Sequence, residues 1–136
     1  MTALLDTGFV LAMLAENDSR HTACMQVMEN EPNPLLPTPI LTELAYMVIR
    51  DAGYAPFLKF FRFALAGTPR LVYPIATDFS RAADIMEKYA DSRLDFVDCA
   101  IVAMAERLNI SRILSVDQRD FRVLWPSHIP AFEILP

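Results

Sequence analysis

Residues 94–121 have the sequence LDFVDCAIVAMAERLNISRILSVDQRDF, and this stretch decides the fold. Its segment 99–105 is apolar at every position, and a helix that is apolar all round is buried inside a domain. Asn109 tolerates the left-handed conformation that ends many helices. The next segment, 112–116, contains Ile and Val and predicts a short strand. We therefore predict one buried helix followed by one core strand, with acidic residues at both polar ends of this unit.

The composition is that of a globular protein with a large core. The chain has 136 residues, of which 54% are apolar, which predicts one domain over residues 1–136 that buries roughly two-thirds of its unfolded surface. No apolar run approaches the roughly 20 residues that span a bilayer, and we find no signal-peptide pattern. The sequence thus predicts a cytoplasmic protein without membrane contact, in which Cys24 and Cys99 are free buried thiols.

The charge and the glycine content exclude several functions. The net charge is −5, which argues against nucleic-acid binding through a broad basic surface. However, ten of the twelve cations are Arg, whose planar fork binds phosphate, so a basic rim around an acidic site stays compatible with this charge. The chain has three Gly, and neither a dinucleotide-binding nor a Walker A motif is present. Two Cys and two His at these spacings form no zinc site.

Short strands alternate with helices along the whole chain. Besides the unit above, strands are expected at 3–5, 35–36, 71–73 and 132–135, and helices at 9–14, 20–30, 38–51, 54–66 and 77–89. Thr7 and Gly8 are expected in a turn, while Thr38 and Thr77 are expected to cap the helices that follow them. This alternation predicts an α/β fold with three layers (α/β/α) around a short parallel sheet.

Four acidic residues are expected to converge at one edge of this sheet. Asp6 and Asp117 each follow a strand, and Glu43 and Asp98 each lie early in a helix. In open parallel sheets, ligands bind beyond the carboxyl ends of the strands. Two carboxylates about 4 Å apart repel by roughly 4 kcal/mol at an effective dielectric constant near 20. The cluster therefore needs protons or a cation, and an all-oxygen set of ligands favours Mg²⁺ or Mn²⁺.

Each acid also has a purely structural interpretation. Asp6 and Glu43 could stabilise helix starts through capping and the helix dipole. Asp98 could pair with Asp95 as a capping arrangement. Asp117 could cap a short helix, and Asp120 is interpreted as the structural member of that pair. The sequence pattern alone leaves these alternatives open for every single residue.

Four stretches together resemble the PIN-domain family, and within it the VapC-type toxins of toxin–antitoxin pairs. They are LLDTG at 4–8, PILTELAY at 39–46, FVDCAIVAMAERL at 96–108 and ILSVDQRDF at 113–121. The resemblance covers the chain in order and implies a Mg²⁺- or Mn²⁺-dependent endoribonuclease whose catalytic and metal-binding quartet falls on Asp6, Glu43, Asp98 and Asp117. It also implies an antitoxin partner and a homodimer.

Some positions depart from the family's usual pattern. Ser115 occupies a supporting hydroxyl position where Thr is more usual, and Gly8 stands where Asn or Ser is common. Asp95 is an extra acid that either joins the metal site or only caps its helix. The alternative to a nuclease is a PIN-like fold kept as a non-catalytic RNA- or protein-binding module, but that form usually lacks one or more of the acids.

Two other enzyme classes share a short motif with this chain. The sequence ALLDTG at 3–8 is also found in aspartic proteases, but those are glycine-rich β folds, whereas a helical segment follows here. A phosphatase with an Asp-x-Asp nucleophile is excluded because Gly8 occupies its second acidic position.

Two further features concern RNA and protein partners. Arg93 and Arg119 flank the acids and are candidates for contacts with the RNA backbone, with solvated surface charge as the alternative. The helix 54–66 has one apolar stripe, while Phe63 and Leu65 point elsewhere. We interpret these two residues as either a stray apolar pair or a second face that a partner covers.

Overall fold

The fold is built on a parallel sheet of five strands with the order β3-β2-β1-β4-β5. The computed structural model describes residues 1–136. The strands are β1 (Ala3–Leu5), β2 (Pro34–Pro37), β3 (Arg70–Val72), β4 (Arg112–Leu114) and β5 (Glu133–Leu135). The helices are α1 (Thr7–Leu14), α2 (His21–Glu29), α3 (Leu41–Ala52), α4 (Tyr54–Leu65), α5 (Ala76–Lys88), α6 (Phe96–Leu108) and α7 (Arg119–Val123). Short 3₁₀ turns precede α3 (Thr38–Ile40) and α6 (Ala90–Ser92).

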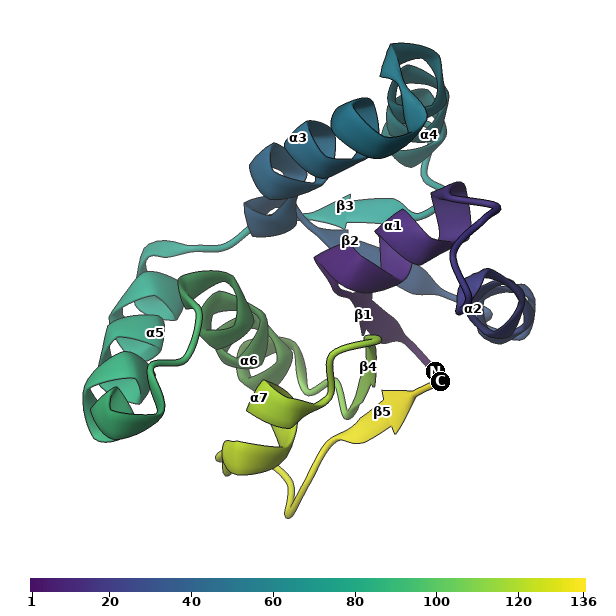
Figure 1. The fold of residues 1–136 in the computed structure, drawn as a ribbon. Helices are drawn as coiled ribbons and strands as arrows, with labels where there is room; N and C mark the ends of the chain where they lie inside the picture. The colour runs from purple at the N-terminus through teal and green to yellow at the C-terminus, as the bar shows by residue number, and fades with distance from the viewer.

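The helices form two layers that enclose the sheet. Helices α1 to α4 contact one another on one face, and α5, α6 and α7 pack together on the other (Figure 1). The predicted three-layer α/β/α fold is therefore confirmed. No helix combines the length and the apolar character that crossing a membrane requires.

Helix α6 is the buried helix that its sequence predicts. Asp95 caps its amino end, where the carboxylate accepts a hydrogen bond from the Val97 N–H at 3.4 Å. Its residues 99–105 are at most 2% exposed. Asn109 ends it in the left-handed conformation with φ of 55°, which an Asn tolerates better than most residues. Both free cysteines, Cys24 and Cys99, are buried as predicted.

The sheet topology places the acidic segments next to each other. The chain proceeds from β1 to β2 and β3 on one side of β1, and then places β4 and β5 on its other side. The switch point, where ligands bind in such sheets, is therefore between β1 and β4. Leu5 pairs with Leu114 at the carboxyl ends of these strands, so the segments that begin at Asp6 and Ser115 leave the sheet side by side.

The structure corrects three local predictions. The expected turn at residues 7 and 8 is wrong, because α1 begins at Thr7, directly after Asp6. Thr38 lies in a 3₁₀ turn rather than at a helix cap. Thr77 does not cap α5, because the Asp78 carboxylate accepts the Ile75 N–H at 2.8 Å instead. At Thr38 a tighter turn, and at Thr77 a nearby carboxylate, replaces the cap that the residue type predicted.

Candidate active site

Asp6 is fixed at the junction of β1 and α1. It is 8% exposed, and its carboxylate accepts a hydrogen bond from the Thr7 N–H at 2.8 Å. Its own N–H donates to the Leu114 carbonyl at 3.0 Å, which ties it to β4. Burial raises the pKa of Asp6 from 3.8 to about 6, against the effect of its hydrogen bonds to Ser115 and Thr7. The side chain is thus held firmly in a place that disfavours its negative charge.

Ser115 links Asp6 to the loop that contains Asp117. Its Oγ lies 2.9 Å from Asp6 Oδ2 and 2.8 Å from the Asp117 carbonyl oxygen, and its one hydrogen serves one of these acceptors at a time. The same Oγ accepts the Asp117 N–H at 3.2 Å. Ser115 is fully buried, so it orients the two acids and does not itself face solvent.

Asp98 is the most perturbed acid of the site. It lies in the first turn of α6, one turn after the capping residue Asp95. Burial, followed by the negative charge of Asp6 and the neighbouring Asp120 carboxyl, raises the pKa of Asp98 from 3.8 to about 9. At neutral pH without a cation, this carboxyl therefore holds a proton.

Glu43 and Asp117 complete the group from two further elements. Glu43 lies in the first turn of α3, and its Oε2 is 3.5 Å from the Thr7 hydroxyl, at the outer limit of a hydrogen bond. Burial and the charge of Asp95 raise the pKa of Glu43. Asp117 lies in the loop before α7 and accepts the Arg119 N–H at 3.3 Å.

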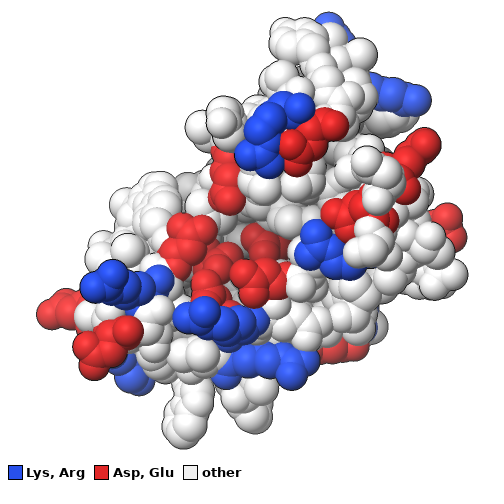
Figure 2. Space-filling model, in the orientation of Figure 1, with Lys and Arg blue, Asp and Glu red and all other residues white.

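All four acids of the predicted quartet, together with Asp95, line one cleft. Its volume is about 180 Å³, and its lining residues are Asp6, Thr7, Gly8, Glu43, Met47, Asp95, Asp98 and Asp117. Figure 2 shows the acidic side chains gathered in a hollow of this face, with basic side chains along one border. The structure thus brings together every acid that the sequence placed at the site.

None of these five acids has a cationic partner. The seven ion pairs of the molecule involve other carboxylates. Buried charges in proteins are normally paired or bind a metal. The cleft therefore has an uncompensated negative charge, and this is its main electrostatic property.

The donor chemistry of the cleft fits a divalent cation. Its polar lining consists of carboxylate and hydroxyl oxygens, which Mg²⁺ and Mn²⁺ prefer, and the one sulfur atom, in the Met47 thioether, is a soft ligand that these ions do not favour. No group of three or more of these side chains is placed to hold a metal ion by itself. Mg²⁺ does not require such a group, because it keeps several waters and binds through one or two carboxylates.

Gly8 is needed for the close approach of α1 to the loop after β4. A Cβ atom at this position would lie 2.8 Å from Val116 Cγ2, which is too close for real side chains. In the family that the sequence resembles, this position is commonly Asn or Ser. The structure explains the glycine in this chain, because a larger residue would push α1 away from the segment that contains Ser115 and Asp117.

The structure adds three residues that sequence analysis did not assign to the site. Thr7 and Met47 line the cleft, and the Asp120 carboxyl lies close enough to Asp98 to raise its pKa. Asp120 was interpreted as structural because it follows Asp117 in a short helix. The position of Thr7 directly after Asp6 was the only signal for its role.

The two candidate arginines differ in their surroundings. Arg93 is exposed, has φ of 49° and takes part in no ion pair. The Arg119 side chain is 78% exposed and lies 3.9 Å from Asp120. Both are thus available to a ligand from solvent.

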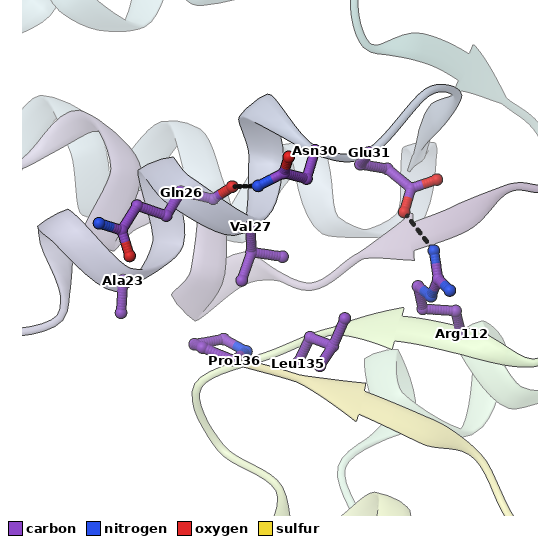
Figure 3. Close-up of a pocket in the computed structure, with 8 residues that line it drawn as sticks. All are labelled: Ala23, Gln26, Val27, Asn30, Glu31, Arg112, Leu135 and Pro136. Atoms are coloured by element: carbon purple, nitrogen blue, oxygen red, sulfur yellow. Dashed lines mark hydrogen bonds and ion pairs between the residues drawn. The ribbon is translucent and has the colours of Figure 1, made fainter.

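The largest cavity of the molecule lies elsewhere. It has a volume of about 490 Å³ and lies between α2 and the strands β4 and β5 (Figure 3). Its two charged residues, Glu31 and Arg112, form an ion pair at 3.0 Å, and Arg112 also pairs with Glu133 at 3.0 Å. The charges of these groups are paired, although Glu31 Oε1 has no hydrogen-bond partner, so the cavity has no cluster of unpaired charges comparable to the acidic cleft.

The fold and the cleft define a class: a three-layer α/β/α protein with an acidic site at the switch point of a parallel sheet. The model of the family described as "PIN domain" matches residues 3–124. The chain therefore belongs to the PIN domain family.

Two relatives resemble the chain over nearly its whole length. Ribonuclease VapC26 of Mycobacterium tuberculosis is 29% identical over 134 residues, which cover 98% of this chain and 99% of VapC26. The crystal structure of Mycobacterium tuberculosis VapC20, described as a sarcin–ricin loop cleaving toxin, superimposes with a TM-score of 0.83 at 18% identity. That alignment covers 96% of this chain and 99% of VapC20, and it shows that the two chains share the fold.

Proposed function

We propose that this protein is an endoribonuclease that hydrolyses RNA phosphodiester bonds with Mg²⁺ or Mn²⁺, and that it is the toxin of a toxin–antitoxin pair. The observation that supports this most is the set of five carboxylates without a cationic partner that line one cleft of a PIN-domain fold. The similarity to the ribonuclease VapC26 supports RNA as the substrate. We also propose that the protein acts in the cytoplasm and that residues 1–136 form a single PIN-like domain.

Each acid has a proposed task. Asp6, Asp98, Asp117 and Glu43 would hold the cation, one or two of them directly and the others through its waters, and Asp95 would add negative charge at the rim. A bound Mg²⁺ would orient and acidify the attacking water and offset charge on a phosphodiester oxygen. Ser115 keeps Asp6 and the Asp117 loop in register through its contacts at 2.9 and 3.2 Å.

The arginines at the rim would position the substrate. Arg93 and Arg119 are exposed, and a guanidinium binds phosphate in a bidentate manner. They would hold the phosphates next to the scissile bond and reduce the repulsion between RNA and a protein with a net charge of −5. A small number of local contacts, rather than a broad basic face, would thus bind the RNA.

The proposed function is tested by an RNA cleavage assay with purified protein. Cleavage is expected with Mg²⁺ or Mn²⁺ and is expected to stop in excess EDTA. The Asp84→Asn variant is a matched control, because it removes the same charge from an exposed position on α5 outside the cleft. Unchanged cleavage in EDTA would contradict the metal requirement, and no cleavage of any RNA with either metal would favour a binding module.

The apolar surface of α4 supports a protein partner. Phe60 and Ala64 are buried, whereas Phe63 and Leu65 are 55% and 59% exposed. We propose that a second copy of the chain or an antitoxin covers this second face. The test is light scattering at tens of micromolar, where we expect a dimer mass for the isolated protein and a monomer mass for Phe63→Asp. A monomer mass for the wild type would contradict the homodimer.

A further inference from the structure

Two exposed aromatic rings lie parallel at the start of α5 and α6. Phe79 and Phe96 have ring centroids 6.2 Å apart and planes inclined by 7°. Phe79 is 47% exposed and Phe96 is 43% exposed. Other aromatic pairs of the chain, such as Phe121 and Phe132, include a fully buried ring or serve the core. The Phe79–Phe96 pair therefore presents apolar ring surface to solvent without an evident role in packing.

The pair lies directly beside the acidic cleft. Phe96 is the first residue of α6 and follows Asp95, which lines the cleft. Figure 2 shows uncharged surface next to the acidic hollow, on the side where α5 and α6 lie in Figure 1. An RNA strand bound at the acids would thus run close to the amino end of α6, where Phe96 lies.

A free cation lies close by in the sequence. Arg93 precedes Phe96 by three residues, is exposed and has no carboxylate partner. An exposed aromatic face with an adjacent unpaired arginine is what proteins use for single-stranded nucleic acid: bases stack on the ring and the cation binds the phosphate.

We propose that Phe79 and Phe96 form a stacking platform for an unpaired nucleobase of the RNA strand bound at the acidic cleft. This inference rests on the proposed ribonuclease function and adds a requirement, namely that the nucleotide next to the scissile phosphate is unstacked from its neighbours. Stacking on a ring tolerates any base. The platform would therefore contribute affinity and position, and leave the choice of base to other contacts.

The experiment measures what the bases contribute to binding. Fluorescence anisotropy gives the Kd of a labelled octamer of adenosine and of the same octamer with abasic sites at all positions. Both are measured in EDTA with the Asp98→Asn protein, so that cleavage does not interfere. With intact rings, we expect the adenosine octamer to bind about 5- to 100-fold more tightly than the abasic strand.

The ring variants then locate this contribution. With Phe96→Ala or Phe96→Leu, we expect the adenosine and abasic octamers to bind with nearly equal affinity, because Leu keeps the apolar volume but lacks the π-face. With Phe96→Tyr, we expect the preference for the adenosine octamer to remain. Tyr54→Ala is the matched control, because Tyr54 is 69% exposed on α4, on the opposite face of the sheet. Circular dichroism verifies that each variant is folded, and Phe79→Ala provides a second test of the same platform.

The outcomes separate the platform from the proposed function. If neither octamer binds, the ribonuclease function itself is contradicted. If both bind equally, or if Phe96→Ala leaves the preference for the adenosine octamer unchanged, the protein binds RNA but the platform is wrong. If Phe96→Ala instead halves the mass measured by light scattering, the rings belong to an interface between two copies and the platform is again overturned.

Discussion

A buried carboxylate lies at each end of the sheet, Glu31 at one and Asp6 at the other, but only Glu31 has a cationic partner. At the amino ends of the strands, the Glu31 side chain is 2% exposed and pairs with Arg112 at 3.0 Å. At the carboxyl end of β1, Asp6 is comparably buried and accepts hydrogen bonds only from neutral groups. The same chain thus pairs a carboxylate where it serves the fold and leaves carboxylates unpaired in the cleft.

This difference gives the two sets opposite expected effects on stability. Removing one partner of a buried ion pair leaves an uncompensated charge and costs free energy. Removing one of several mutually repelling carboxylates relieves the fold instead. The cleft acids therefore cost stability in the isolated chain, which is the expected property of groups that bind a cation and a substrate rather than the rest of the protein.

The largest effect is expected for Asp98→Asn. Asn keeps the shape and the hydrogen-bonding ability of the side chain but cannot ionise to bind a cation, so RNA cleavage should fall by orders of magnitude, about 100-fold or more. In metal-free buffer the free energy of unfolding should stay level or rise. A cleavage assay and denaturant unfolding in EDTA measure both effects. Near-normal cleavage by this variant would remove Asp98 from the catalytic group.

An effect of opposite sign on the free energy of unfolding is expected at the amino ends of the strands, where Glu31 pairs with Arg112. Arg112→Met should lower the free energy of unfolding by about 3 kcal/mol, because Glu31 loses its partner and its Oε1 already has none. Glu31→Gln in the Arg112→Met background should recover part of this loss, since the buried charge is gone. Urea unfolding measures both variants. A loss well below about 1 kcal/mol would show that the two ends of the sheet do not differ in this way.

A smaller effect is expected for Gly8→Ala. The added Cβ would meet Val116 Cγ2 at 2.8 Å, and overpacking of this kind costs about 1–3 kcal/mol. Because the contact lies between α1 and the loop with Asp117, cleavage should also decrease. Gly67→Ala is the control for replacing a glycine, because open space surrounds Gly67, although its φ of 102° adds local strain. Full stability and full cleavage for Gly8→Ala would contradict a close approach at this position.

Per step of one pH unit, the smallest effect is the pH dependence of stability without metal. The pKa of Asp6 is raised to about 6 and that of Asp98 to about 9, both from 3.8. Between pH 3.8 and about 9, the folded state binds more protons than the unfolded state. The free energy of unfolding therefore falls as the pH rises. The slope assigned to Asp98 between pH 6 and 9 is on the order of 1 kcal/mol per pH unit. Asp98→Asn should lose this slope in urea unfolding at several pH values; an identical slope would contradict its cause.

The sequence predicted the layers of the fold and the four acids because these depend on local patterns. The apolar run 99–105 dictates a buried helix, Asp6 directly follows β1, and Asp117 lies three residues after the end of β4. The close approach at Gly8 was not predictable, because it depends on how α1 packs against Val116 across the sheet. The same is true of the Asp120 carboxyl, whose proximity to Asp98 results from the orientation of α7.

The central claim, that the cleft acids bind a divalent cation, is tested most directly by calorimetric titration with Mn²⁺. The wild-type protein should bind Mn²⁺ saturably, and Asp98→Asn should bind it at least about 10-fold more weakly. Asp84→Asn, which removes a charge outside the cleft, should bind it as the wild type does. Absence of saturable binding to the wild type, or equal affinity for Asp98→Asn and the wild type, would contradict the account.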